Sequence, residues 1–176
     1  MMGTAPNMQL EENLALALRR GDKRGLRWGV TREERHAYHE VLKTLGLGLE
    51  DRMTAKVGLL SGGQRQAVTL LMASLKKPKL LLLDEHTAAL DPATAAKVLE
   101  LSDQIVAENK LTTLMITHNM KAALNTGTRT LMMDEGRILL DLSGAEREHT
   151  SLDDLLSMYA SCKKQEFDND RMLLES

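Results

Sequence analysis

The sequence predicts an α/β fold in which a mainly helical segment precedes a parallel sheet. Two short aliphatic runs, residues 80–83 and 114–116, have the length and composition of buried strands, and polar residues follow each of them. Between them, Asp91 and Pro92 form a strong helix start, with a capping residue followed by a first-turn proline. The order strand, helix, strand is typical of a parallel sheet with crossover helices.

Helical periodicity predicts three helices before the first strand. Residues 7–20 and 32–45 have apolar residues at helical spacing, and a basic, glycine-containing loop lies between them within residues 19–35. The third helix begins after Ser61 and stops before Pro78. Its predicted buried stripe consists of Val68, Leu71, Met72 and Leu75.

The remaining elements follow from turn and cap signals. The helix that begins after Asp91 is expected to end near Asn109, with Val98, Leu101 and Ile105 facing inward. Residues 128–133 and 137–142 flank a turn and predict a β-hairpin, and a short helix is expected after Ser151. We therefore expect a helical subdomain over residues 1–77, the rear portion of an α/β core over 78–145, and a C-terminal helix and tail over 146–176.

Composition excludes several classes of protein. The 176 residues suffice for one domain, and the net charge of −2 gives no electrostatic case for binding nucleic acid. The single cysteine, Cys162, excludes an internal disulfide and fits a reducing compartment. No apolar run approaches the roughly 18 residues that a membrane span needs, and the first residues lack a signal-peptide pattern. We expect a cytoplasmic protein.

Two strings of residues have the chemistry of a phosphate site. Ser61, Gly62 and Gly63 open a helix, whose first backbone N–H groups and positive dipole end favour an anion. Asp84 and Glu85 follow an aliphatic strand, which places two carboxylates at the carboxyl edge of the sheet, where α/β folds bind ligands. Either string alone has a structural interpretation, as a helix cap or as a polar strand end.

Taken together, the motifs resemble the ATP-binding subunit of an ATP-binding cassette (ABC) transporter. Residues 60–66 match the family's signature motif, residues 80–85 its Walker B strand, residues 89–91 its D-loop, and Thr117-His118 its switch histidine. All occur in the family's order. The resemblance implies part of a P-loop NTPase (ABC ATPase) sheet with a helical subdomain, which binds ATP and Mg²⁺ and hydrolyses ATP to drive solute transport.

The resemblance also implies roles for individual residues. Asp84 would hold Mg²⁺ through water, Glu85 would be the general base, and His118 would bridge the γ-phosphate and the attacking water. The residues expected to bind ATP are Ser61, Gly62, Gly63, Gln64 and Asp91. In the family, the signature motif meets the nucleotide that the partner subunit holds. His86 stands where most members have proline, and we expect it to alter the turn after Glu85 without adding a catalytic group.

The resemblance is incomplete, because no Gly-x-x-x-x-Gly-Lys-Ser/Thr phosphate loop occurs in the sequence. The expectation is a truncated chain, the C-terminal portion of the family, with no ATPase activity in isolation and with an uncovered apolar edge around Leu81 and Leu114. The family implies a second ATPase subunit in a homodimer, integral-membrane permease subunits and a solute-binding protein as partners, with the chain held at the inner membrane face. The subgroup resembled is that of bacterial amino-acid-type importers.

Three other interpretations stay open. A non-catalytic interaction or regulatory module could use the signature face alone, and the missing phosphate loop favours it, while Glu85 and His118 count against it. An inactive gene fragment is a second possibility. A DNA-repair or chromosome-structure ATPase shares these motifs, but residues 32–59 leave no room for the long coiled coil such proteins carry ahead of the signature.

Overall fold

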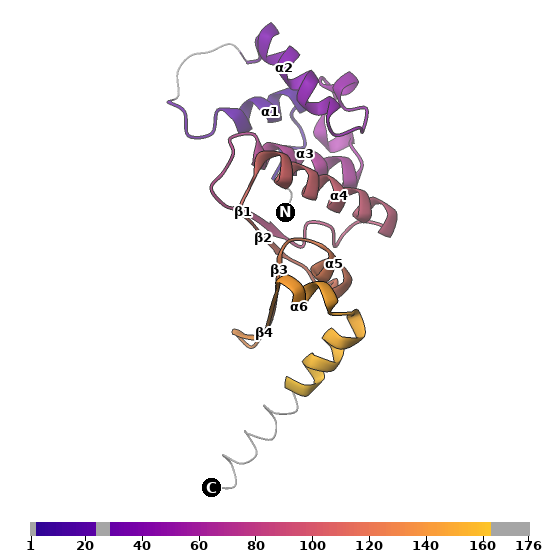
Figure 1. Cartoon of the computed structure of the whole chain (residues 1–176). Helices are drawn as coiled ribbons and strands as arrows, with labels where there is room; N and C mark the ends of the chain where they lie inside the picture. Colours follow the sequence, from indigo (N-terminus) through magenta and orange to yellow (C-terminus); the bar gives the residue numbers. More distant parts are fainter. Residues whose placement is uncertain (1–2, 24–28, 163–176) are drawn as a thin grey trace. The chain divides into compact units, whose positions relative to one another are not determined.

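The computed structural model describes residues 3–23 and 29–162 (Figure 1). Its internal contacts divide the chain into two compact units, Met1–Ile116 and Thr117–Ser176, which are described separately. The part of the basic loop at residues 24–28 and the predicted polar tail at 163–176 lie outside the described residues. The division into subdomains after residues 77 and 145 stays a prediction.

The first unit contains four α-helices, two short 3₁₀ turns and two strands among its described residues. In chain order they are α1 (Leu10–Leu18), α2 (Arg32–Lys43), η1 (Glu50–Arg52), η2 (Val57–Leu59), α3 (Gly62–Ser74), β1 (Leu81–Asp84), α4 (Pro92–Asn109) and β2 (Thr113–Ile116). The predicted helices and strands are confirmed, although α1 is shorter than residues 7–20 at both ends. The two 3₁₀ turns were not predicted, because three residues are too few to show a period.

One apolar core unites the helices with one face of the strands. Leu10 and Leu14 of α1, Leu42 of α2 and Val68 of α3 are almost fully buried in it. The predicted stripe of α3 is confirmed for Val68, Leu71 and Met72, and Leu75 packs against the edge of the same cluster. From α4, Ile105 joins it and Leu101 is partly buried against it, as their helical spacing predicts. Residues of α3 and of β1 therefore belong to one core, which holds the two elements in place.

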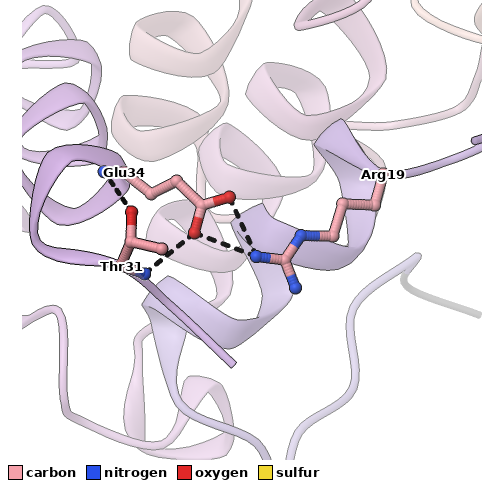
Figure 2. A network of polar contacts seen from close by, with 3 residues as sticks. All are labelled: Arg19, Thr31 and Glu34. Carbon is pink, nitrogen blue, oxygen red and sulfur yellow. Dashed lines mark hydrogen bonds and ion pairs between the residues drawn. The ribbon is translucent and has the colours of Figure 1, made fainter. Parts of the chain in front are cut away.

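Two charged contacts join α1 to α2. Glu34, at the third position of α2, accepts hydrogen bonds from the backbone N–H of Thr31 at 2.9 Å and from Arg19 Nη2 at 2.8 and 2.9 Å (Figure 2). Arg35 makes a second, bidentate pair with the buried Glu11 of α1, at 2.6 and 2.7 Å. Two arginines of the predicted basic loop are thus neutralised within the fold.

The strands β1 and β2 pair in parallel, with Leu82 opposite Leu114 and Asp84 opposite Ile116. The prediction that both strands are buried is wrong for one face of this sheet. Leu81 and Leu83 face the core, but Leu82 is 64% exposed and Leu114 and Ile116 are 50% and 53% exposed. The reason is that the described helices of this unit cover one face only, while the aliphatic sequence carries leucine on both. The predicted uncovered apolar edge around Leu81 and Leu114 is a different feature from this exposed face, and Leu81 itself is buried.

The second unit is built around an antiparallel hairpin. Its elements are α5 (Met120–Asn125), β3 (Arg129–Asp134), β4 (Arg137–Ser143), α6 (Gly144–His149) and a helix over residues 152–162. The predicted hairpin is confirmed, and Glu135 and Gly136 form its turn with φ of 45° and 78°. Arg147 ties α6 to the rest by donating to Thr130 Oγ1 at 2.9 Å and to the carbonyl of Thr126 at 2.8 Å. The predicted C-terminal helix is confirmed, whereas α5 and α6 were not foreseen.

Candidate functional site

The signature helix α3 begins with a reciprocal cap. Ser61 Oγ accepts a hydrogen bond from the backbone N–H of Gln64 at 3.2 Å, and Gln64 Oε1 accepts one from the N–H of Ser61 at 3.1 Å. The N–H groups of Gly62 and Gly63, at the first two helical positions, have no acceptor within the helix. The side chain of Gln64 also donates to the carbonyl of Leu47 at 3.4 Å, so it stabilises the loop before α3 as well as the helix cap. Ser61 is exposed and Gly62 is half-buried, so the start of α3 can offer the N–H group of Gly62 to an anion.

The starts of α3 and α4 lie against each other. A Cβ atom on Gly63 would collide with Thr94 Cγ2, and a Cβ on Gly62 would lie 3.1 Å from Leu90 Cδ2. Gly63 is buried at this contact. The glycines therefore have a packing reason to be small, in addition to any need for a ligand to approach the backbone. Thr94 is a partner that sequence reasoning missed, because nothing local links it to Gly63.

The start of α4 is capped by Asp91. Its Oδ1 accepts a hydrogen bond from the backbone N–H of Thr94 at 3.0 Å, and Pro92 occupies the first helical position, as predicted. Hydrogen bonds from Thr94, first through its side chain and then through its backbone, lower the pKa of Asp91. The carboxylate is therefore anionic at neutral pH. Its predicted role in binding a nucleotide stays a prediction.

The two carboxylates after β1 differ in conformation. Asp84 ends the strand on the exposed face, opposite Ile116. Glu85 is half-buried and has φ of 42°, while its N–H extends the ladder by donating to the carbonyl of Ile116 at 2.9 Å. Because a left-handed residue leaves the extended path, the alternation of side chains along β1 does not extend to Glu85. The turn, and not the strand, sets the direction of this side chain.

His86, beside Glu85, has a specific partner in α4. Its Nε2 lies 3.0 Å from the Oγ of Ser102, which is buried and donates to the carbonyl of Val98 at 2.7 Å. Burial lowers the pKa of His86, and the nearby Asp103 carboxylate partly opposes that shift. No local pattern predicts this contact, since the two residues are 16 positions apart.

His118 belongs to the second unit and is described with it. It is exposed and lies just before the start of α5, which Asn119 caps by accepting from the N–H of Ala122 at 3.0 Å. The backbone N–H of Asn119 donates to Thr117 Oγ1 at 3.1 Å, so the segment that carries His118 is held on its C-terminal side. Its predicted role at the γ-phosphate stays a prediction.

Asp84 could supply one carboxylate to a magnesium ion, without further acidic or histidine ligands grouped around it among the described residues. Among the side chains that the structure describes, no group of three or more His, Cys, Asp or Glu residues could hold a metal ion. Mg²⁺ often takes one or two carboxylates and completes its shell with water and substrate phosphates. The exposed, strand-end position of Asp84 is compatible with that kind of site.

Two further observations bear on the site. A pocket of about 360 Å³ lies in the second unit, lined by residues including Lys121, Asn125, Arg147 and Glu148, and none of the motif residues line it. Across residues 3–23 and 29–162, no helix combines the length and the apolar character needed to cross a membrane.

Comparison with known proteins identifies relatives of one kind. A family profile described as ABC transporter matches residues 2–88. The tyrosine transport ATP-binding protein of Clostridioides difficile is 44% identical over 158 residues, which are 90% of this chain and 62% of that protein. The thiamine import ATP-binding protein ThiQ of Yersinia pestis is 37% identical over 136 residues, covering 77% of this chain and 54% of that protein.

Solved structures agree on the fold. The ADP conformation of MJ1267, an ATP-binding cassette of an ABC transporter, has a TM-score of 0.69 at 24% identity, covering 88% of this chain and 63% of that one. A nucleotide-free ATP-binding cassette gives a TM-score of 0.66 with the same coverage. The fold is thus that of the ABC ATPase, and this chain spans 54–62% of the two curated relatives described. The motif order and these relatives together place the chain in the family of ABC-transporter ATP-binding proteins.

Proposed function

We propose that this chain supplies the signature and Walker B portion of an ATPase subunit that couples ATP hydrolysis to solute transport. The observation that carries the proposal is the junction of α3 and α4. There, the N–H group of Gly62, at the first helical position of α3, lies near the start of α4, which Asp91 caps. A helix start favours an anionic ligand, and backbone donors are well suited to phosphate oxygens.

The roles of the side chains follow from their positions. Glu85 is the proposed general base, which accepts a proton from the attacking water. Asp84 would hold Mg²⁺ through water, and the bound ion would neutralise phosphate oxygens. Ser61, Gly62, Gly63 and Gln64 would donate to the γ-phosphate, and Asp91 would lie near the subunit interface. In the dimer, that γ-phosphate would lie between the subunits, with these donors on one side and His118 of the other subunit on the opposite side.

The proposed partners are a second ATPase subunit, integral-membrane permease subunits and a solute-binding protein. In this arrangement the chain lies in the cytoplasm, on the inner membrane face, through its contact with the permease. A relative named for tyrosine transport, 44% identical, supports an amino-acid-type solute. The identity to the protein named for thiamine import is lower, at 37%.

The test is a chimera that joins this chain to the part of the Clostridioides difficile relative that it does not match. This completed chain should release phosphate from Mg-ATP. The matched control is the same chimera with Asp84→Asn, which keeps the size of the side chain and removes its charge. A well-folded chimera that binds ATP but hydrolyses it equally fast with and without Asp84 would overturn the proposed role of the strand end.

One alternative function is a non-catalytic interaction module. It is favoured by the absence of a phosphate-loop motif from residues 1–176 and by the exposed apolar face that carries Leu82, Leu114 and Ile116. Under this alternative, the completed chimera would be stable and would not hydrolyse ATP. The same experiment therefore separates the two functions.

A further inference from the structure

The turn after β1 holds a residue in an unusual backbone conformation. Glu85 has φ of 42°, a region that side chains other than glycine, asparagine and aspartate rarely adopt. The turn is closed by backbone hydrogen bonds, from Ala88 N–H to the Glu85 carbonyl at 3.0 Å and from Leu90 N–H to the Thr87 carbonyl at 3.2 Å. Such a conformation persists only where the surroundings over-determine it. This turn therefore needs an anchor outside its own backbone.

The anchor is on α4. Ser102 Oγ has one hydrogen, and it donates this hydrogen to the Val98 carbonyl at 2.7 Å. The same oxygen lies 3.0 Å from His86 Nε2, so the contact is a hydrogen bond only if Nε2 carries a proton and donates it. With the Ser102 hydrogen donated to Val98, the bond to His86 requires the Nε2–H form of the imidazole. The acceptor is rigid, because Ser102 is 2% exposed and lies in the middle of an 18-residue helix.

We infer that His86 is a positioning residue for Glu85: its Nε2–H···Oγ bond to Ser102 fastens the turn to α4 and holds Glu85 in its left-handed conformation. The inference rests on the proposed role of Glu85 as general base. A base must be held within a narrow range of positions to act on water, and a strained turn needs a fixed point next to it. His86 itself contacts no reacting group in this scheme.

A competing explanation is that His86 and Ser102 merely fill space in the core. The chain offers a matched control for it. Ser74 of α3 is also buried, at 4% exposure, and its hydroxyl donates to the Leu71 carbonyl at 2.8 Å, but no histidine is bonded to it. Ser74→Ala and Ser102→Ala therefore remove the same kind of helix hydrogen bond, and only the second also removes the acceptor of His86.

The test uses the full chain labelled with ¹⁵N, and it needs no nucleotide. The first measurement is the ring ¹⁵N spectrum of His86 above its pKa, where the inference requires the Nε2–H form. The second is amide hydrogen exchange at Glu85, expressed relative to Leu81 of β1, whose N–H donates at 2.9 Å to the carbonyl of Thr112, the residue before β2. Where both amides exchange through global unfolding, the ratio cancels a change in global stability.

Ser102→Ala should raise the exchange of Glu85 relative to Leu81 by on the order of five- to tenfold, as expected for the loss of one hydrogen bond. Ser74→Ala should leave the ratio unchanged. An Nδ1–H ring in the parent chain would overturn the inference without any variant, and so would an equal ratio in the two serine variants. Because neither readout involves hydrolysis, an inactive chimera would leave this result standing, and an active one would not rescue a failed result.

Discussion

Arg35 and Glu11 form a bidentate ion pair that joins α2 to α1 across 24 residues of sequence. The pair is unequal in exposure, because the side chain of Glu11 is 5% exposed and that of Arg35 is 49% exposed. A buried carboxylate has lost its hydration and depends on its partner, whereas a half-exposed guanidinium can be rehydrated by water. The contribution of this contact to folding stability therefore depends mainly on the burial of Glu11.

We expect Glu11→Gln to lower the free energy of unfolding by about 1–3 kcal/mol, because it removes a charge-assisted pair and buries an amide group instead. Urea denaturation of the chain measures the change. The control is Asp22→Asn, which acts on an exposed carboxylate bonded to Lys76 at 2.6 Å in the same unit. Equal losses in the two variants would contradict the importance given to burial.

The contact between Gly63 and Thr94 makes a second prediction about packing. Gly63→Ala should destabilise the chain by about 1–3 kcal/mol, because the new Cβ has to displace Thr94 Cγ2. Thr94→Ser removes only that methyl group, so the double variant should recover most of the loss. Gly29→Ala is the control: no atom lies within 4 Å of its added Cβ, and the change should stay within about 0.5 kcal/mol. Failure of Thr94→Ser to rescue would show that the strain lies elsewhere.

Local signals made much of the fold predictable. The caps at Ser61 and Asp91 and the apolar spacing in α3 and α4 gave the helices and their starts. The helices α5 and α6 were not predicted, because six residues are too few to show a helical period. The exposure of Leu82 was not predicted either, because a strand with leucine on both faces has the same sequence whether one face or two are covered.

The candidate site divides in the same way. The residues that offer charges and backbone donors were visible as motifs, since their chemistry is carried by residue type and spacing. The contacts that hold them were not, because Thr94 packs on Gly63 and Ser102 bonds His86 through the fold, not through the local sequence. The left-handed conformation of Glu85 was also hidden, as glutamate has no preference for it.

Burial of His86 makes stability depend on pH. The pKa of His86 in the folded chain is lowered from its ordinary value of 6.5 by burial, an effect that Asp103 partly offsets. The unfolded chain therefore binds more protons than the folded chain as pH falls below about 6.5, so this residue's contribution to stability is lost in that direction. The loss levels off once the pH is below the folded pKa.

We expect His86→Gln to flatten the pH dependence of the urea midpoint below pH 6.5, because the titrating group is gone. An unchanged slope in His86→Gln would mean that the dependence comes from other groups. Circular dichroism melts at matched pH values provide a second measurement.

The isolated chain should show no ATPase activity and at best very weak affinity for ATP. The reason is that residues 1–176 contain no phosphate-loop motif to cradle the triphosphate beside Asp84 and Glu85. Phosphate release with Mg-ATP in excess measures it. Turnover that Glu85→Gln abolishes would contradict the prediction and reveal another phosphate site.

In the completed chimera, by contrast, Glu85→Gln should keep ATP binding and slow hydrolysis by roughly 10² or more.

The last prediction concerns which nucleotide the signature helix serves. Gly62 and Gly63 offer N–H donors only, and no lysine-bearing phosphate loop accompanies them in residues 1–176. We therefore expect them to act on ATP held by the partner subunit. Gly62→Asp should block the approach of a phosphate and add a like charge at the helix start. Completed chains with different affinity tags allow each heterodimer to be purified and assayed.

Two heterodimers give opposite results. A Gly62→Asp subunit paired with a Glu85→Gln subunit should hydrolyse ATP, because cross-subunit action puts both lesions in one composite site and leaves the other intact. A subunit carrying both changes, paired with an unchanged subunit, should be inactive, since each site then has one lesion. If the signature acted on the nucleotide of its own subunit, the two outcomes would be exchanged. The reciprocal pair thus distinguishes the arrangements even if the variants differ in stability, because both heterodimers contain the same substitutions.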